Sequence, residues 1–374
     1  MSHPEQAVVD DVISGLESKF GDMSVTRGDK HNFVGMNFCF TKDGKVEIIM
    51  RDYLEECIKT FGEAFNGGAK TPAQADLFKS SEEAEKLSEE KAEIFHHVVA
   101  KLLFVAKRVR PDIDLVISYL CGGVDRSTTE DWGKLRRLLH YLNGTLDMVR
   151  RIGMSKGRKM ETWEDASYGV HPDMKGHTDG AVSLGLGLIQ HKSLKQKLNT
   201  KSSTESELVG ASDFIGYSVW IKRFMTEQGY KLNDLVFYQD NESAIKLASN
   251  EFRARSNKSR HINIRYFFIW DIRGREGIKL MHCRTEEMIA DFFTKPVQGG
   301  RFKMLRNYIM GHATEPIEER VEKCEQNHIT SETIVAIGPV EENNRKVRRK
   351  TYAEIVGKYA LGMTKLHIKE NATA

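Results

Sequence analysis

The N-terminal part of the chain alternates between helical and strand-like spacing of apolar residues. Residues 10–20 place their apolar side chains on one helical face and predict a helix. Residues 31–40 and 45–50 read as two strands, and the Asp-Gly pair between them predicts a hairpin. Helical spacing returns at 51–61, so a second helix is expected there.

The middle of the chain has the spacing of a helical region. A glycine-containing break at 66–72 precedes an amphipathic helix at 92–108, a second helix at 113–121 and a third at 128–141. The third helix is expected to end at an Asn-Gly pair. Three consecutive helices with short connections predict a small helical subdomain.

Strand-like runs become frequent after Gly144. Strands are expected at 145–151, 160–168, 181–190 and 235–238, and helices at 205–228 and 243–249. Strands followed by a helix-strand-helix alternation predict a mixed sheet flanked by helices. The expected fold class is therefore α+β, with a mixed α/β arrangement in this part.

Composition narrows the class of protein. With 40% hydrophobic and 29% charged residues, the 374-residue chain is too polar for a membrane protein and too apolar for wholesale disorder. Its 56 Lys and Arg against 53 Asp and Glu leave a charge of +3, which alone does not indicate nucleic-acid binding. Five dispersed cysteines without a CxxC pair favour a reducing, intracellular compartment. We expect neither a secretory signal nor a membrane span.

Four carboxylates occupy positions that a mixed sheet would bring together. Asp165 is in an expected strand, Glu207 in the first turn of the long helix, Asp240 at the carboxyl end of a buried strand, and Asp291 on a late helix. Two divalent cations about 3.5–4 Å apart require several anionic oxygens, as in the metal-assisted hydrolysis of phosphodiesters. The four residues are therefore candidate metal ligands.

Each carboxylate also has an ordinary structural interpretation. Glu207 could complete a capping box with the threonine three residues before it. Asp240 could cap the helix that follows it. Glu164 adjoins Asp165, and nothing local shows which of the two faces inward. Asp291 could be a solvated residue on an amphipathic helix.

Four sequence motifs surround these candidates. They read LNTKSSTESEL at 198–208, YQDNESAI at 238–245, RHINIRYFF at 260–268 and EMIADFFTKP at 287–296. In this order they resemble the RNase H block of copia-type long-terminal-repeat retrotransposon Pol polyproteins. The WEDASY stretch at 163–168 matches the family's usual text in part.

The resemblance implies a reaction and a set of site residues. In that family the block hydrolyses the RNA strand of RNA–DNA hybrids. The matching catalytic and metal-binding positions are Asp165, Glu207, Asp240 and Asp291, with Glu205 as a rival for Glu207. The implied metal is two Mg²⁺ ions, with Mn²⁺ as an alternative, and the implied partner is an RNA–DNA hybrid. No organic cofactor and no membrane are implied, and the location is a cytoplasmic particle or the nucleus. A catalytically inactive, nucleic-acid-binding remnant is the alternative function.

The resemblance extends upstream and covers about residues 1–311. DKHNFVGM at 29–36 resembles the primer-gripping hairpin of a reverse transcriptase palm, although an ordinary hairpin fits equally well. AKRVRPD at 106–112 lies in a region similar to the helical thumb. The Tyr-x-Asp-Asp turn that binds the polymerase metals in such enzymes does not occur in the sequence, so no polymerase activity is expected from this chain alone.

Four domains or segments are expected from this resemblance. They are a palm remnant at 1–65, a linker with a thumb-like helical subdomain at 66–150, an RNase H-like domain at 151–311 and a polar tail at 312–374. The tail contains a basic run at 345–350, which we interpret as a solvated segment.

Basic residues cluster on both sides of the central carboxylates. They are Lys192, Lys195, Lys197 and Lys201 before the long helix, and Arg253, Arg255, Lys258, Arg260 and Arg265 after Asp240. Neutralising the phosphates of a nucleic acid needs such clusters, so these residues are predicted to bind the hybrid. A solvated protein surface is the alternative interpretation.

Overall fold

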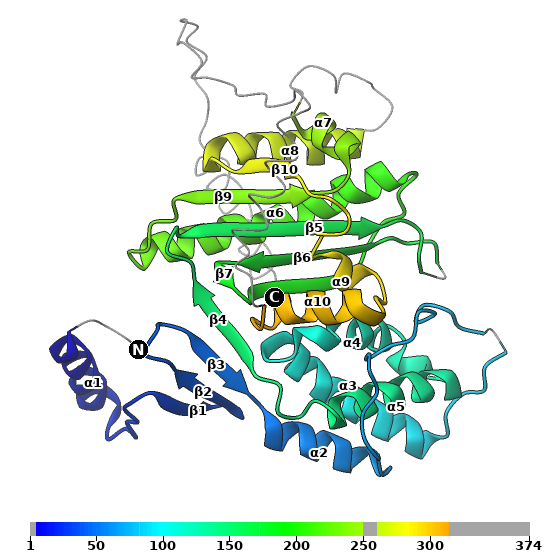
Figure 1. The fold of residues 1–374 in the computed structure, drawn as a ribbon, viewed down its shortest axis with the longest axis horizontal. Coiled ribbons are helices and arrows are strands. Elements are labelled where there is room, and N and C mark those ends of the chain that lie inside the picture. Colours follow the sequence, from blue (N-terminus) through cyan, green and yellow to red (C-terminus); the bar gives the residue numbers. More distant parts are fainter. Residues whose placement is uncertain (1–4, 82, 172, 250–259, 314–374) are drawn as a thin grey trace, which may run out of the picture. The chain divides into compact units, whose positions relative to one another are not determined.

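The computed structural model describes residues 5–81, 83–171, 173–249 and 260–313. Within these ranges the chain is a mixed α and β fold with two five-stranded sheets (Figure 1). The expected mixed class is confirmed. Residues 314–374, including the basic run at 345–350, lie outside the described residues. None of the described helices is long and apolar enough to cross a membrane.

The N-terminal segment contains more turns than expected. Its elements are α1 (Gln6–Phe20), β1 (Lys30–Phe33), β2 (Met36–Phe40), β3 (Val46–Ile49) and α2 (Arg51–Phe61). The single strand expected at 31–40 is wrong, because the chain reverses at Val34 and Gly35, whose φ angles are 52° and 75°. The hairpin across the Asp-Gly pair is confirmed, since β2 and β3 pair antiparallel.

The expected helical region is confirmed. It consists of α3 (Glu89–Arg108), the 3-10 turn η1 (Pro111–Ile113), α4 (Asp114–Cys121), the 3-10 turn η2 (Val124–Arg126) and α5 (Thr129–Asn143). Helix α3 begins after Ser88, whose side chain accepts a hydrogen bond from the Lys91 amide. Thr128 and Asp131 form a capping box at the start of α5. These caps explain why local sequence determines the helix starts.

The first sheet joins the N-terminal strands to the later part of the chain. Its order is β1-β2-β3-β4-β7, with β4 at Arg150–Met154 and β7 at Gly185–Leu186. The strand expected at 145–151 begins later than predicted. The backbone amides of Thr145 and Met148 form turn hydrogen bonds to Leu142 and Thr145 before β4 starts.

The second sheet has the order β10-β9-β5-β6-β8. The strands are β10 (Lys279–His282), β9 (Asp234–Gln239), β5 (Lys159–Ser167), β6 (His177–Ser183) and β8 (Leu188–Lys195). Strands β10, β9 and β5 run parallel, whereas β6 pairs antiparallel with β5 and β8. The single strand expected at 181–190 is wrong, because the chain turns back through Gly185 and Gly187, which both have positive φ.

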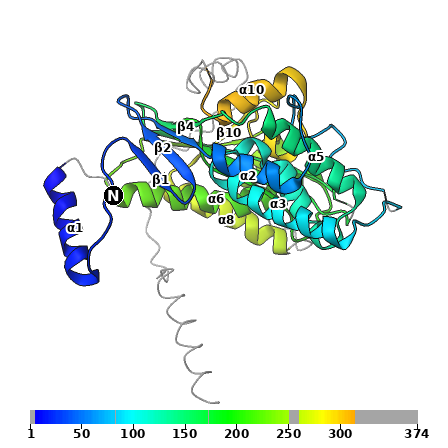
Figure 2. The same ribbon diagram turned by 90° about the horizontal axis from the view of Figure 1, so that it is seen from below.

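Helices cover both faces of the second sheet. They are α6 (Ser203–Glu227), α7 (Glu242–Ser249), α8 (Arg260–Glu276), α9 (Asp291–Thr294) and α10 (Gly299–Ile309). Figure 2 shows α6 and α8 on one face of the sheet and α10 on the other. The predicted helix at 205–228 is confirmed by α6.

Two apolar cores hold this arrangement together. The core under α6 and α8 contains Phe214, Phe237 and Ile269. The larger core combines side chains from three parts of the chain, such as Leu54 of α2, Leu102 of α3 and Phe293 of α9. A shared core anchors the helical subdomain against the sheet face that carries α9.

Candidate metal centre

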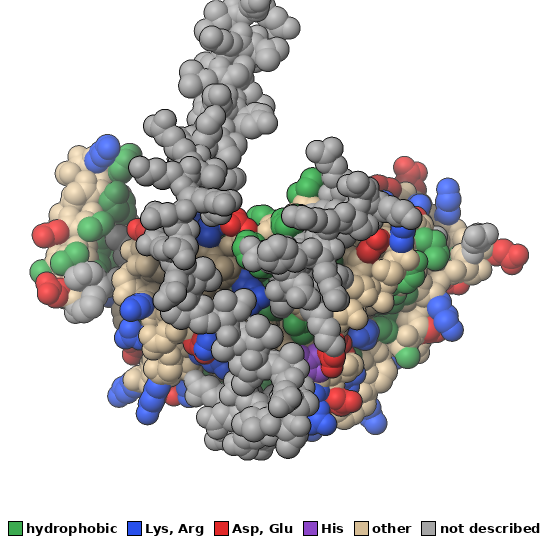
Figure 3. Space-filling model, turned by 90° about the horizontal axis from the view of Figure 1, so that it is seen from above, with side chains coloured by type: hydrophobic (Ala, Val, Ile, Leu, Met, Phe, Trp, Pro, Cys, Tyr) green, Lys and Arg blue, Asp and Glu red, His purple; other side chains and the backbone are tan. Residues whose placement is uncertain are grey.

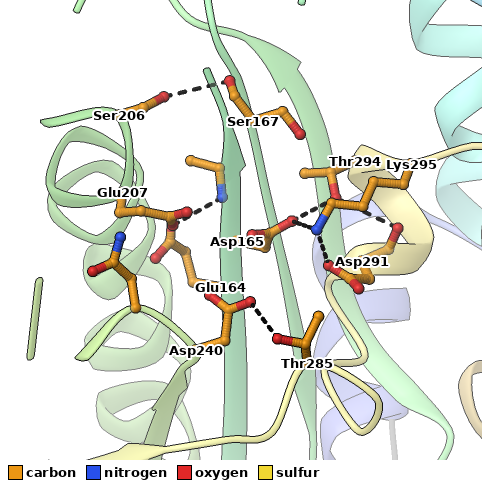
Figure 4. Close-up of polar contacts among 12 residues, drawn as sticks. Glu164, Asp165, Ser167, Ser206, Glu207, Asp240, Thr285, Asp291, Thr294 and Lys295 are labelled. Atoms are coloured by element: carbon orange, nitrogen blue, oxygen red, sulfur yellow. Dashed lines mark hydrogen bonds and ion pairs between the residues drawn. The ribbon is translucent and has the colours of Figure 1, made fainter. Parts of the chain in front are cut away.

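Three of the four expected carboxylates converge at one end of the second sheet. Asp165 lies near the end of β5, Glu207 on α6, and Asp240 directly after β9. One oxygen of each lies within 4.8 Å of the other two (Figure 4). Asp165 and Glu207 are buried, while Asp240 is half-buried. Because β5 and β9 are parallel neighbours, their carboxyl ends meet and bring Asp165 and Asp240 together.

Glu207 does not cap helix α6. The cap is Ser202, whose side chain accepts from the Glu205 amide, and Glu205 in turn accepts from the Lys201 amide at 2.7 Å. The capping interpretation of Glu207 is therefore wrong. Its Oε2 atom instead accepts a hydrogen bond from the Ala166 amide at 3.0 Å, which ties α6 to the strand that carries Asp165.

Asp240 does not cap the following helix either. Asn241 performs that role, since its Oδ1 atom accepts from the Ala244 amide at 3.0 Å. The carboxylate of Asp240 is left to the metal centre, where Thr285 donates to its Oδ2 atom at 3.4 Å.

The side chain of Gln239 fixes the positions of Glu207, Glu164 and the Asp240 backbone, and the sequence did not predict this role. Its Oε1 atom accepts from the amides of Asp240 at 2.8 Å and Asn241 at 3.1 Å. The amide nitrogen therefore faces the acids and donates to Glu164 at 2.7 Å and Glu207 at 3.2 Å. A polar residue at the end of an otherwise apolar strand was the available signal.

Both members of the Glu164–Asp165 pair are buried, but on different sides of β5. Asp165 faces the other metal-centre carboxylates, whereas Glu164 lies under α6, where a Cβ on Gly210 would come within 2.0 Å of its Oε1 atom. Any side chain at position 210 would therefore clash with the carboxylate of Glu164. Burial, followed by the charge of Glu207, raises the pKa of Glu164 well above its usual value.

The electrostatics of the three converging residues favour a bound cation. Burial, followed by the charges of Asp165 and Asp240, raises the pKa of Glu207 to about 9. Burial also raises the pKa of Asp240. Like charges held together in a buried site hinder one another's ionisation, and a divalent cation removes that cost. Three carboxylate oxygens are the hard donors that Mg²⁺ and Mn²⁺ bind, so the residues fit such an ion.

Asp291 lies beside this group but is bound to basic side chains. It opens α9 and is fully buried, so its interpretation as a solvated residue is wrong. Lys295 contacts its Oδ1 atom and Arg301 its Oδ2 atom, each at 2.5 Å. Burial raises the pKa of Asp291, and these two cations oppose that shift. The structure therefore brings Asp165, Glu207 and Asp240 together, and Lys295 lies between Asp165 and Asp291.

Comparison with known proteins relates the chain to transposon proteins. No protein-family model matches it. It is 26% identical over 323 residues to the retrovirus-related Pol polyprotein from transposon TNT 1-94 of Nicotiana tabacum, covering 82% of this chain and 24% of that protein. It is 31% identical over 214 residues to the corresponding polyprotein from transposon RE2 of Arabidopsis thaliana, covering 56% of this chain and 14% of that protein.

A third relative is more distant. The transposon Ty1-BR Gag-Pol polyprotein of Saccharomyces cerevisiae is 23% identical over 317 residues, which cover 79% of this chain and 18% of that protein. The chain's homologues are Pol polyproteins of transposons. The chain spans about a quarter or less of the length of these three relatives.

The predicted nucleic-acid-binding residues are only partly described. Lys197 and Lys201 are exposed, and Lys195 pairs with Asp173 at 2.8 Å. Lys192 is half-buried, with its ammonium 3.8 Å from the centre of the Tyr217 ring. Figure 3 shows basic and acidic side chains interspersed over the visible described surface.

The remaining basic residues lie after Asp240. Arg265 is half-buried and pairs with Asp213 of α6. The side chains of Arg253, Arg255, Lys258 and Arg260 lie outside the described part of the chain. Binding of a hybrid by this basic group remains a prediction.

Proposed function

We propose that this chain is the RNase H-type part of a copia-type retrotransposon Pol polyprotein and hydrolyses the RNA strand of RNA–DNA hybrids. The observation that carries the proposal is the convergence of Asp165, Glu207 and Asp240, each within or next to a motif that resembles the family's block. Homology to transposon Pol polyproteins supports it. The second sheet, with parallel and antiparallel strands flanked by helices, is consistent with an RNase H-like arrangement.

The residues that would hold a divalent cation are Asp165, Glu207 and Asp240. When bound there, Mg²⁺ or Mn²⁺ supplies positive charge to the scissile phosphate and favours ionisation of an attacking water. Neighbouring groups fix the orientation of the acids. Thr294 donates to the Oδ2 atom of Asp165 at 2.6 Å, and Gln239 donates to Glu207. Such partners preorganise acidic ligands before the ion arrives.

Asp240 is the least buried of the three acids, so a phosphodiester would approach a bound ion from its side. Asp240 is half-buried, whereas Asp165 and Glu207 form the buried wall of the site. The exposed lysines at 195, 197 and 201 would contact phosphates of the bound hybrid and hold it in register. Phosphate contacts carry no sequence information, so cleavage is expected to be independent of base sequence.

Asp240→Asn tests this function, because it removes an anionic ligand with little change in volume. We expect cleavage of a labelled RNA–DNA hybrid in Mg²⁺ to fall by more than about 100-fold, since even losses outside the ligand set cost about 10–100-fold. Asp271→Asn, at an exposed aspartate paired with Arg275 on α8, is the matched control and should cleave normally.

Two results would contradict the proposal. Undiminished cleavage by Asp240→Asn would remove Asp240 from the reaction. Hybrid binding without any cleavage by the unaltered chain would favour the alternative of an inactive nucleic-acid-binding remnant.

A further inference from the structure

The metal centre contains a positive charge of its own. The ammonium of Lys295 lies between two carboxylates, 2.5 Å from Oδ1 of Asp291 and 3.3 Å from Oδ2 of Asp165 (Figure 4). Lys295 directly follows α9, one helical turn after Asp291. The side chain is 45% exposed, yet its charged end reaches the buried acids. An ammonium thus occupies the space between Asp165 and Asp291.

Arg301 closes the other side of Asp291. It extends from α10, contacts Oδ2 of Asp291 at 2.5 Å and donates to the Thr285 carbonyl at 2.6 Å. A guanidinium remains protonated in proteins. Both oxygens of the fully buried Asp291 are therefore engaged by cations.

The oxygens of Asp165 are divided in the same way. Its Oδ2 atom receives both the hydroxyl of Thr294 at 2.6 Å and the ammonium of Lys295 at 3.3 Å. The Oδ1 atom is left to serve as a ligand beside Glu207 and Asp240. Asp165 therefore contacts the ammonium and also belongs to the three acids that would hold an ion.

The charges of the ionised centre balance with one divalent ion. Asp165, Glu207, Asp240 and Asp291 carry four negative charges when ionised, and Lys295 and Arg301 cancel two of them. One divalent cation cancels the remaining two. A second such ion would leave the buried centre with excess positive charge, which low-polarity surroundings disfavour.

We propose that Lys295 is a built-in cation that takes the place of a second metal ion, so that the centre binds one divalent cation at Asp165, Glu207 and Asp240. The proposal rests on the metal centre of the proposed function and replaces the two ions that the sequence resemblance implies by one ion and an ammonium. A lysine ammonium has three donors. Two of them face Asp291 and Asp165, which leaves one for a phosphate oxygen of a bound nucleic acid.

Titration of the full chain with Mn²⁺, followed by the electron paramagnetic resonance signal of free Mn²⁺, tests this proposal. We expect one tightly bound Mn²⁺ in the unaltered chain. Lys295→Met removes the ammonium, so only Arg301 still offsets the four carboxylates, and a second, more weakly bound Mn²⁺ should appear, because Asp165 and Asp291 then offer a vacant anionic position. Lys295→Arg keeps the charge and should still bind one. Lys303→Met, at an exposed lysine on α10, is the control and should also bind one.

The number of Mn²⁺ ions bound by the unaltered chain already distinguishes the possible results. One bound ion supports the proposal, two would overturn it, and none would overturn the proposed function itself. A count of one in folded Lys295→Met would show that the ammonium does not fill a metal position.

Asp291→Asn provides an independent check if Lys295→Met fails to fold. Because Asp291 is not a ligand in this proposal, the dissociation constant of Mn²⁺ should change by less than about threefold, whereas Asp240→Asn should raise it by more than about tenfold. Equal losses in the two variants would overturn the proposal.

Discussion

Asp165 on β5 lies directly opposite Asp179 on β6 in the antiparallel register, and both side chains are buried. Neither oxygen of Asp179 has a hydrogen-bond partner among the described residues. The nearest basic group is Nε2 of His177 at 3.4 Å from Oδ1. Burial, followed by the charge of Asp165, raises the pKa of Asp179 well above its usual value, so the folded chain favours the protonated form of this carboxyl more than the unfolded chain does.

Asp179→Asn should therefore stabilise the protein at high pH. An unfolded aspartate is ionised above about pH 4, whereas the raised pKa of the folded chain opposes ionisation, so stability is lost as the pH rises above about 4, and an amide removes that loss. We expect the free energy of unfolding, measured by urea denaturation, to rise by at least about 1 kcal/mol at pH 8 and by much less at pH 4. A loss of stability at pH 8 would contradict this assignment.

Glu207 should make the metal-free protein less stable as pH rises. Its pKa is raised to about 9 in the folded chain, so between about pH 4.5 and 9 the folded state binds one proton more than the unfolded state. Stability then falls by about 1.4 kcal/mol per pH unit for this proton. With EDTA present to remove metal ions, Glu207→Gln should make the free energy of unfolding fall less steeply between pH 5 and 8, by about 1.4 kcal/mol per pH unit.

Saturating Mg²⁺ should flatten the same decline in the unaltered chain. A bound cation favours the carboxylate form of Glu207, and binding to the folded state adds stability by mass action. The comparison of urea denaturation with Mg²⁺ and with EDTA at pH 8 measures this effect. Equal stabilities under the two conditions would count against a cation at Glu207.

Gln239→Leu should weaken metal binding while preserving the ligands. Leucine fills much of the same space but removes the donor that Glu164 and Glu207 share and the acceptor for the amide of Asp240. We expect Mn²⁺ affinity to fall about 10-fold or more, in the range typical for partners of metal ligands. Gln228→Leu at the exposed end of α6 is the control. Unchanged affinity would show that Gln239 supports only the strand end.

Lys197 and Lys201 should contribute to hybrid affinity through phosphates. Each contact on a duplex contributes about −0.9 to the slope of log affinity against log salt, so replacing both lysines by alanine should flatten the slope by about two. Arg265→Ala should change the slope much less, because Arg265 is already paired with Asp213. Fluorescence anisotropy at several salt concentrations measures both, and an unchanged slope in the lysine variant would identify a solvated surface.

Local patterns predicted the helices better than the strands. The Asp-Gly pair predicted the β2–β3 hairpin, and helical spacing predicted α2, α5 and α6. The failures were turns inside apolar runs. Val34 adopts a positive φ that β-branched residues rarely accept, so nothing in its type indicates a turn. At 181–190 the turn signal was present, in Gly185 and Gly187, but continuous apolar character concealed it.

At the site too, local sequence located the acids but did not predict contacts between residues far apart in the chain. The motifs that resemble the retrotransposon block contained or adjoined the three converging acids. They could not show that Ser202 and Asn241 provide the helix caps and leave Glu207 and Asp240 for the centre. The pairing of Lys295 with Asp165 joins residues 130 positions apart, and only the packing of α9 on the sheet brings them together.

Strand β4 has a practical consequence for anyone who wishes to isolate the metal centre. It pairs with β3 on one side and β7 on the other, and its first residue, Arg150, is a fully buried guanidinium that donates to the carbonyls of Arg108 and Leu188. A shortened protein that starts at residue 151 would lose the hydrogen bonds of Arg150 and the pairing with β3. One edge of β4 would then be unpaired and could pair with other chains. Such a fragment would aggregate through this edge. A fragment that keeps the β2–β3 hairpin and the helical region would keep β3 paired with β4.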